Sequence, residues 1–256
     1  MSGLVVDIGN ARLKWAEVRD GRLAARGHAL HVDAPDDAFA KLAAALAPDV
    51  RRVVAANVGG PALGERLAAV TRARLGIEPE LVATSRERFG VRCGYDDPAR
   101  LGVDRWVAVI AAHRIAGGAA CVVSAGTAVT FDAVDASGVH RGGLILAGPR
   151  LAAAALAEGT SNIGPTDLPA EKPEGIGVLG RSTAEAVGRG TMLGIAAAVD
   201  RAFDIVCREL GSRPPLYVTG GDAEMLAPWL ATDSELRADL VLEGLALFLA
   251  SPAGAD

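Results

Sequence analysis

Two short stretches of this sequence combine glycine with small polar or charged residues, a pattern typical of turns that bind phosphate. Residues 5–14 read VVDIGNARLK and residues 122–130 read VVSAGTAVT. The glycine of each turn lets backbone N–H groups approach an anion closely. The first stretch adds Asp7, whose carboxylate suits a hydrated Mg²⁺, and Lys14, whose ammonium suits a phosphate oxygen. Each stretch is therefore a candidate phosphate-binding turn.

The two stretches repeat one another in spacing. Asp7, Gly9, Asn10 and Ala11 match Ser124, Gly126, Thr127 and Ala128. A turn glycine then follows fourteen residues after the first member of each set, at Gly21 and at Gly138. A single glycine turn would need no explanation beyond closing a hairpin. Two in register, one with an Asp and a Lys, favour a duplicated α/β unit whose turns grip a polyphosphate from both sides.

The elements of the first half must position the first turn. Residues 4–6 and 12–18 read as two strands of a hairpin, and residues 33–47 have helical spacing, with Asp33 as the expected cap. Residues 52–56 read as a buried strand that leads through Asn57 into a further helix. Asn57 either lines the cleft or shapes that turn. The order hairpin, helix, strand, helix predicts a mixed sheet with helices packed on it.

The second half repeats a hairpin and adds longer segments. We expect a glycine-rich strand ending at Pro149, an alanine-rich helix to about Ala157 and a long mobile loop over 158–180. A further helix should begin with the capping-box pair Ser182 and Glu185. After it we expect a strand over 216–218, a turn over 219–222 and a buried last helix over 240–249. The turn over 219–222 suits a flat base lying against backbone, and equally suits a simple entry into a helix.

Residues 89–105 differ in kind, because they are rich in Gly, Pro and Asp and show no period before Trp106, where a helix is expected to begin. A polar loop between periodic segments often carries function. Asp104 and Arg105 place a carboxylate beside a guanidinium near the start of that helix. The carboxylate can accept a proton from an alcohol. The alternative is a helix cap with an exposed ion pair.

Composition narrows the class of protein. The 256 residues are half hydrophobic but only 4% aromatic, so a large core of Ala, Val and Leu is expected. A net charge of −5 without a basic face argues against nucleic-acid binding. Three distant cysteines form no zinc or disulfide pattern, which indicates a reducing cytoplasm. Neither a signal peptide nor a membrane-length apolar run is expected.

Taken together and in order, the motifs resemble those of the type III pantothenate kinases, members of the acetate kinase/sugar kinase/Hsp70/actin superfamily. The resemblance rests on Asp7-Ile8-Gly9-Asn10 with Lys14, Gly94-Tyr95, Gly102-Val103-Asp104-Arg105-Trp106, Gly126-Thr127-Ala128-Val129-Thr130, Gly142-Gly143, Gly148, Thr183-Ala184-Glu185-Ala186 and Thr219-Gly220-Gly221-Asp222. It covers nearly the whole chain. It implies two duplicated actin/ribonuclease-H-like α/β halves, residues 1–115 and 116–256, with a nucleotide cleft between them.

The resemblance also implies an activity, the phosphorylation of pantothenate by ATP with Mg²⁺ at the start of coenzyme A biosynthesis. ATP and its phosphates would contact Asp7, Ile8, Gly9, Asn10, Ala11, Arg12, Leu13, Lys14, Gly126, Thr127, Gly220 and Gly221, with Asp7 near Mg²⁺. Pantothenate would contact Tyr95, Gly102, Val103, Asp104, Arg105 and Thr183, with Asp104 as general base. Members of the family are homodimers whose pantothenate pocket lies at the subunit interface, so a homodimer is expected here.

Two positions depart from the family pattern. Ala11 stands where the family usually has Thr or Ser, which removes one hydroxyl from the first turn. Ser124 stands where the family usually has an Asp that binds K⁺ or NH₄⁺, which argues against the usual monovalent-cation site. Two alternatives to a pantothenate kinase remain: a superfamily kinase acting on another small acceptor, and a non-catalytic accessory or regulatory member of the same family.

Overall fold

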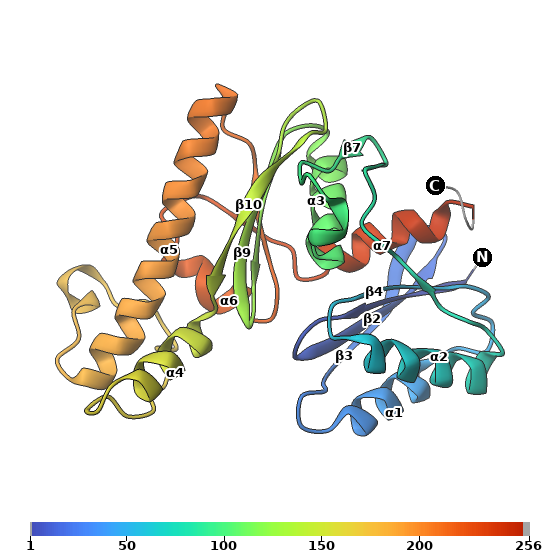
Figure 1. Ribbon diagram of the computed structural model, residues 1–256, viewed down its shortest axis with the longest axis horizontal. Helices are drawn as coiled ribbons and strands as arrows, with labels where there is room; N and C mark the ends of the chain where they lie inside the picture. Colours follow the sequence, from blue (N-terminus) through green and yellow to red (C-terminus); the bar gives the residue numbers. More distant parts are fainter. Residues whose placement is uncertain (1, 253–256) are drawn as a thin grey trace. The chain divides into compact units, whose positions relative to one another are not determined.

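Each half of the chain builds a five-stranded mixed sheet, and the strands of the two sheets follow the same order. The computed structural model describes residues 2–252 (Figure 1). The strand orders are β3-β2-β1-β4-β5 and β10-β9-β8-β11-β12. In the first sheet, β2 pairs antiparallel with β1 and with β3, and β4 pairs in parallel with β1. In the second, β9 pairs antiparallel with β8 and with β10, and β11 pairs in parallel with β8. This repetition confirms the predicted pair of duplicated α/β halves.

The described residues fall into two compact units, 2–111 with 239–252, and 112–238. The first unit contains β1 (Gly3–Ile8), β2 (Arg12–Arg19), β3 (Arg22–Leu30), α1 (Pro35–Ala45), β4 (Val53–Asn57), α2 (Pro61–Leu75), β5 (Glu80–Leu81), β6 (Glu87–Arg88), β7 (Val91–Arg92), η1 (Pro98–Arg100), most of α3 (Val103–Ala116) and α7 (Leu240–Ala250). The second contains β8 (Ala120–Ala125), β9 (Ala128–Val134), β10 (His140–Ala147), α4 (Pro149–Gly159), η2 (Gly175–Val178), α5 (Thr183–Leu210), β11 (Leu216–Thr219), α6 (Ala223–Leu226), η3 (Ala227–Trp229) and β12 (Glu235–Leu236).

The helix α7 packs on β1 and β4, so the chain returns to its first unit after residue 238. The sequence-based division into 1–115 and 116–256 places a single boundary in the chain. That division stays a prediction of where the duplicated sequence units begin.

Alternation along β1 sends its side chains to two different layers. Leu4, Val6 and Ile8 join one core cluster with Phe39 and Leu42 of α1 and Leu67 of α2. Val5 lies in a second cluster with Ala16 and Val18 of β2, Val107 of α3, and Leu242 and Leu245 of α7. Asp7 has the same parity as Val5. Its side chain therefore belongs to the face that α3 and α7 cover.

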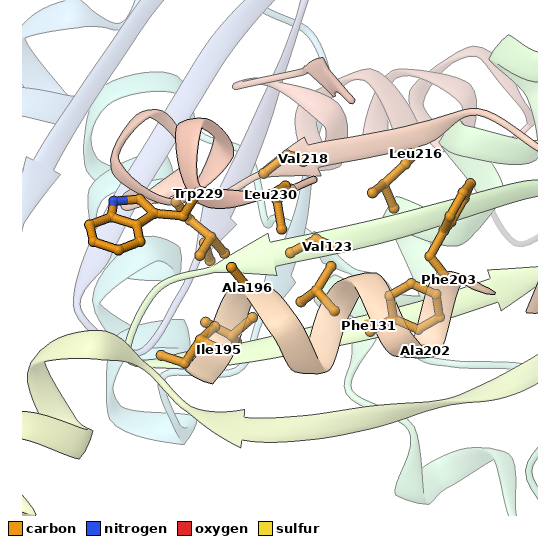
Figure 2. Close-up of a cluster of buried hydrophobic side chains, with 14 of the residues drawn as sticks. Val123, Phe131, Ile195, Ala196, Ala202, Phe203, Leu216, Val218, Trp229 and Leu230 are labelled. Carbon is orange, nitrogen blue, oxygen red and sulfur yellow. The ribbon is translucent and has the colours of Figure 1, made fainter. Parts of the chain in front are cut away.

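The second sheet buries one face against α5 in the same way (Figure 2). Val123, Phe131 and Val218 of this face pack with Ala196 and Phe203 of α5. Trp229 and Leu230, after α6, close the same cluster. Ser124 has the opposite parity to Val123, so it lies on the other face of this sheet.

Several predicted boundaries need correction. α1 begins at Pro35 after Ala34, and Asp33 is not its cap, because proline at the first position already fixes the helical φ and needs no N–H partner. α3 begins at Val103 rather than Trp106, since the Trp106 N–H already donates to the Gly102 carbonyl at 3.0 Å. β3 was not expected, because this edge strand is mostly exposed and shows no apolar alternation.

The N-cap at the start of α5 is confirmed, with the reciprocal bond of Glu185 made to the residue before Ser182. The Ser182 hydroxyl accepts the Glu185 N–H at 3.2 Å, and the Glu185 carboxylate accepts the Arg181 N–H at 2.7 Å. The segment between α4 and α5 contains only the short η2, and its mobility stays a prediction. No helix within residues 2–252 has both the length and the apolar character needed to cross a membrane.

Candidate active site

Asp7 and Lys14 face each other across the first hairpin. They are directly paired in the antiparallel register of β1 and β2, so both side chains project from the sheet face that α3 and α7 cover. The first turn of α3 contains Asp104, and Asp239 directly precedes α7. The fold therefore brings two acidic residues from distant parts of the sequence to the Asp7–Lys14 pair.

The charges at this face perturb each other. Burial, and next the nearby Asp104 carboxylate, raise the pKa of Asp7 from its ordinary 3.8 to about 7, against the opposing effect of Lys14. The Asp7 Oδ1 atom is buried and accepts no hydrogen bond within the described part of the chain. A buried carboxylate oxygen beside a second carboxylate favours a bound cation. The residues present thus fit a Mg²⁺ ion at Asp7.

Lys14 responds in the opposite sense to the same environment. Burial lowers its pKa most, Asp7 and then Asp239 act to raise it, and Arg12 acts to lower it. Asp239 is itself paired with Arg26 at 3.0 Å. Lys14 therefore belongs to a network of fixed charges, which is not the environment of an isolated residue on a solvated strand.

The turn between β1 and β2 is held in shape by its surroundings. The Gly9 N–H donates to the Arg12 carbonyl at 3.0 Å, and the His31 N–H donates to the Ala11 carbonyl at 3.1 Å. His31 Nε2 lies 2.8 Å from the Gly9 carbonyl oxygen, to which it donates in the appropriate tautomer. A side chain at Gly59 would come within 2.9 Å of that same oxygen. Sequence reasoning missed His31 because it follows β3, the strand that the pattern did not predict.

Asn57 shapes the turn in which it lies. Its side chain donates to the Gly60 carbonyl at 2.8 Å and accepts the Gly59 N–H at 3.0 Å. Of the two interpretations left open by the sequence, these bonds support the shaping of the turn.

Asp104 and Arg105 lie side by side at the start of α3, and Arg105 is buried rather than exposed. The Arg105 N–H donates to Asp104 Oδ1 at 2.8 Å, and the Arg105 side chain is buried, donating to the Tyr95 hydroxyl at 3.0 Å. The Arg105 guanidinium carbon also lies 5.8 Å from the centre of the Tyr95 ring. A side chain at Gly102 would come within 2.7 Å of Asp104 Oδ1. The predicted acceptor residues Tyr95, Gly102, Asp104 and Arg105 are thus neighbours in the fold, and Val103 lies between them in the first turn of α3.

The second unit brings together the other two glycine turns. The Gly126 N–H donates to the Ala128 carbonyl at 3.0 Å, and the Thr127 carbonyl accepts the Gly148 N–H at 2.9 Å where α4 begins. Gly220 has φ +101, and a side chain there would come within 2.1 Å of the Ala125 carbonyl oxygen. The predicted residues Gly126, Thr127, Gly220 and Gly221 therefore lie around the end of β8. The N-terminus of α4 lies at the same place, and a helix N-terminus favours an anion.

Ser124 occupies the position in the second sheet that Asp7 has in the first. It pairs with Thr130 of β9 and with Thr219 of β11, so hydroxyls stand where the first sheet has the Asp7–Lys14 pair. The two turns differ in length although their motifs have equal spacing in the sequence. Four residues separate the paired Ile8 and Leu13, whereas three separate the paired Ala125 and Val129.

The nearest acidic residue along β9 is already engaged. The Asp132 carboxylate and His140 Nε2 form a fully buried pair at 2.9 Å. Thr183, the remaining predicted acceptor residue, is the exposed first residue of α5 in the second unit, whereas Tyr95 and Arg105 belong to the first.

The second unit also contains a cavity of about 690 Å³ that the sequence did not predict. Its lining comes from α4, the following loop and α6, and comprises Arg150, Ala154, Ala157, Glu158, Pro165, Thr166, Asp167, Leu168, Pro169, Ala170 and Met225. Arg150 forms an ion pair with Asp222 at the end of the 219–222 turn. The cavity therefore adjoins the predicted adenosine-binding turn.

Comparison with known proteins shows the family to which the chain belongs. A family model described as type III pantothenate kinase matches residues 3–204. The chain belongs to the type III pantothenate kinase family. It is 38% identical to the type III pantothenate kinase of Aromatoleum aromaticum, covering 98% of this chain and 99% of the relative. The corresponding protein of Nitrosococcus oceani is 36% identical over 95% of this chain and 92% of its own length.

A solved structure extends the likeness of fold beyond the family. The activator of 2-hydroxyisocaproyl-CoA dehydratase from Clostridium difficile, with bound ADPNP, superposes with a TM-score of 0.53 at 14% identity, covering 97% of this chain and 94% of that one. Together with the two sheets of equal strand order, this places the chain in the actin-like α/β fold.

Proposed function

We propose that this protein phosphorylates pantothenate with ATP, giving 4′-phosphopantothenate, the first step of coenzyme A biosynthesis. The observation that carries the proposal is that Asp104 lies at the same face as the paired Asp7 and Lys14. The Arg105 N–H donates to Asp104, and the Arg105 side chain donates to Tyr95. Phosphoryl transfer depends mainly on positioning and charge neutralisation. This group of residues provides both for a phosphate donor and an alcohol acceptor.

The donor side uses the glycine turns. The Gly9 and Gly126 N–H groups already donate to the carbonyls of Arg12 and Ala128, so the two turns would bind phosphate through their remaining N–H groups, and Lys14 would add its ammonium. The turn at Gly220 and Gly221 would receive the adenosine. Mg²⁺ held through Asp7 would supply positive charge to the phosphate oxygens. The buried Asp7 oxygen supports this assignment, because it has a negative neighbour and no hydrogen bond in the described chain.

The acceptor side uses the start of α3. Asp104 would accept the proton of the pantothenate hydroxyl, since its carboxylate lies at the same face as Asp7. Arg105, oriented by the Tyr95 hydroxyl, would bind the anionic acceptor. Gly102 leaves room beside the Asp104 carboxylate. Thr183, in the second unit, stays a predicted contact of the acceptor.

The proposal also covers the oligomeric state, the location in the cell and the dependence on monovalent cations. We expect a homodimer, supported by the exposed apolar side chains Leu144 and Ile145 on the edge strand β10, of which Ile145 is 65% exposed. We expect a cytoplasmic location, supported by the free thiols of Cys93, Cys121 and Cys207. We expect weak or no dependence on K⁺ or NH₄⁺, since Ser124 and its paired Thr130 are neutral.

The test is an assay with ATP, Mg²⁺ and pantothenate that measures both ADP and the phosphorylated product. A panel of other alcohols, including sugars and hydroxy acids, tests the alternative of a kinase for another acceptor. Turnover of another acceptor alone would contradict the proposed substrate. Nucleotide binding without turnover of any acceptor would support the accessory or regulatory alternative.

A further inference from the structure

The hairpin of β6 and β7 has an unusual turn. Phe89 and Gly90, the two residues between the paired Arg88 and Val91, both have positive φ, +49° and +79°. The β2–β3 turn has the same geometry at Asp20 and Gly21, with φ of +50° and +74°. Asp-Gly is a sequence that such turns favour, whereas a bulky residue rarely adopts positive φ. Local preference therefore does not explain Phe89, and another interaction must hold it.

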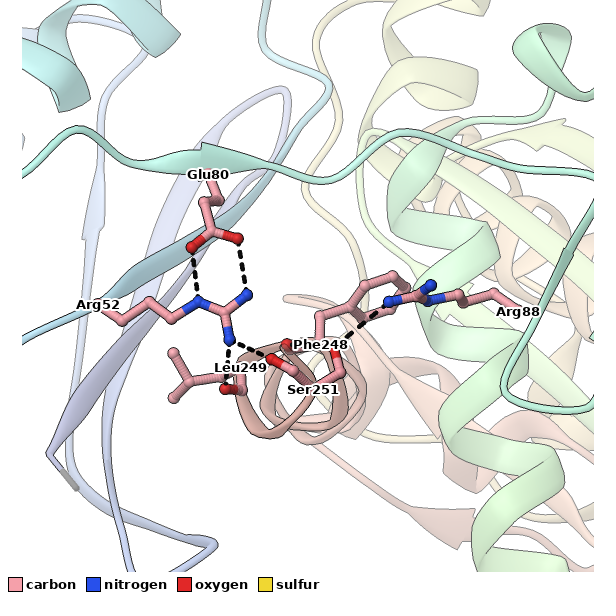
Figure 3. A network of polar contacts seen from close by, with 6 residues as sticks. All are labelled: Arg52, Glu80, Arg88, Phe248, Leu249 and Ser251. Atoms are coloured by element: carbon pink, nitrogen blue, oxygen red, sulfur yellow. Dashed lines mark hydrogen bonds and ion pairs between the residues drawn. The ribbon is translucent and has the colours of Figure 1, made fainter. Parts of the chain in front are cut away.

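That interaction comes from the end of α7. The rings of Phe89 and Phe248 meet edge to face with centroids 4.9 Å apart. The Arg88 guanidinium carbon lies 4.9 Å from the centre of the Phe89 ring and 5.6 Å from that of Phe248. Arg88 also donates to the Ser251 hydroxyl at 3.3 Å (Figure 3). The tip of the hairpin is thus attached to the C-terminal end of α7 by two rings and one guanidinium.

The end of α7 is in turn fixed to the first sheet. Arg52, which directly precedes β4, donates to both carboxylate oxygens of Glu80 at 2.5 and 2.7 Å. The same guanidinium donates to the carbonyl of Leu249 at 2.8 Å and to that of Ser251 (Figure 3). These carbonyls end the helix and have no partner in a further turn. The hairpin therefore docks on a fixed platform.

The base of the hairpin leads to the predicted acceptor pocket. The Cys93 N–H donates to the Arg86 carbonyl at 2.9 Å. The Arg86 guanidinium donates to the carbonyls of Tyr95 at 2.8 Å and Asp96 at 2.6 Å. Tyr95 then accepts the hydrogen bond of Arg105. A continuous series of contacts runs from α7 through the hairpin to the residue beside Asp104.

We propose that Phe89 and Phe248 are positioning residues for the acceptor pocket, because they dock the β6–β7 hairpin on α7 and so hold Tyr95 against Arg105. This inference rests on the proposed function for the identity of the acceptor. Neither ring belongs to the residues assigned to the donor or the acceptor. Their effect should therefore appear in the binding of one substrate.

The test compares three variants with the wild-type enzyme. Phe89→Asn keeps a residue suited to positive φ but removes the ring, and Phe89→Tyr keeps the ring. Phe39→Leu, in α1 on the opposite side of the same sheet, is the matched control for the loss of an aromatic ring from this unit. For each variant, KM for pantothenate, KM for ATP, kcat and Tm are measured, together with hydrogen exchange of the amides in residues 93–97 and 53–57.

Phe89→Asn should raise KM for pantothenate by about 2- to 12-fold, the range that corresponds to the energy of one aromatic pair, with KM for ATP unchanged. Exchange should accelerate in residues 93–97 but not in β4. Phe89→Tyr should behave as wild type. Phe39→Leu should lower Tm and leave KM for pantothenate unchanged.

In an active enzyme, an unchanged KM for pantothenate in Phe89→Asn would overturn the inference, and so would an equal rise in Phe39→Leu. If the wild-type protein does not phosphorylate pantothenate, the proposed function fails by that result alone. Hydrogen exchange then decides the docking by itself. Equal exchange of residues 93–97 in Phe89→Asn and wild type would refute it.

Discussion

The raised pKa of Asp7 predicts that its ionised form costs stability. In the unfolded chain the carboxyl ionises near 3.8, whereas in the folded protein burial and Asp104 hold the pKa at about 7. Between these values the folded state binds the proton that the unfolded state has released, so stability falls as pH rises through this window and stays low above it. Asp7→Asn replaces the carboxylate with a neutral group of the same shape and should remove this dependence.

The magnitude follows from the two pKa values. Each pKa unit is worth about 1.4 kcal/mol, so the change from 3.8 to about 7 corresponds to at most about 4 kcal/mol above pH 7. At pH 5 the same two values give about 2 kcal/mol. Residue 7 keeps some solvent exposure, and screening by water reduces both figures. The stabilisation by Asp7→Asn should therefore be greater at pH 8 than at pH 5 by about 1 to 2 kcal/mol.

The assay is urea unfolding of both proteins at several values between pH 5 and 8, without divalent metal. Asp20→Asn is the control, because this exposed carboxylate lies in a turn that Asn suits equally. Asp7→Asn should also abolish most kinase turnover, since it removes the proposed Mg²⁺ contact. A stability difference between Asp7→Asn and wild type that does not change with pH would refute the reasoning about Asp7.

Three further predictions test other parts of the site. Asp104→Asn should lower kcat by about 10²- to 10⁴-fold without loss of folding, as expected for removal of a general base; turnover near that of wild type would exclude Asp104 from this role. Activity in sodium or Tris buffer should change little when K⁺ is added at constant ionic strength, and Ser124→Asp should introduce K⁺ activation, because a carboxylate near phosphate needs a cation partner. Strong K⁺ activation of the wild type would show that another group supplies the site. Light scattering at micromolar concentration should give the mass of a dimer, and a fully active stable monomer would contradict the proposed assembly.

Much of this arrangement followed from local pattern. The glycines of residues 5–14 and 122–130 indicated two hairpins, and their matched spacing indicated the duplication that the equal strand orders confirm. The N-cap at Ser182 and the start of α4 at Pro149 also depend on neighbouring residues alone. Such features are determined by steric and hydrogen-bonding preferences within a few residues, so the sequence contains them directly.

Other features depend on residues that meet only in the folded chain. The residues near Asp7 in the sequence do not indicate that Asp104 will lie close to it. The Asp104 carboxylate nevertheless contributes to the raised pKa of Asp7, because α3 covers the same face of the sheet. His31 contacts the Gly9 turn from a position directly after β3, a strand with no apolar pattern. Phe89, which has positive φ, contacts the ring of Phe248, 159 residues later. Burial, electrostatic coupling and docking are properties of the packed unit, and for this reason only the tertiary structure decided them.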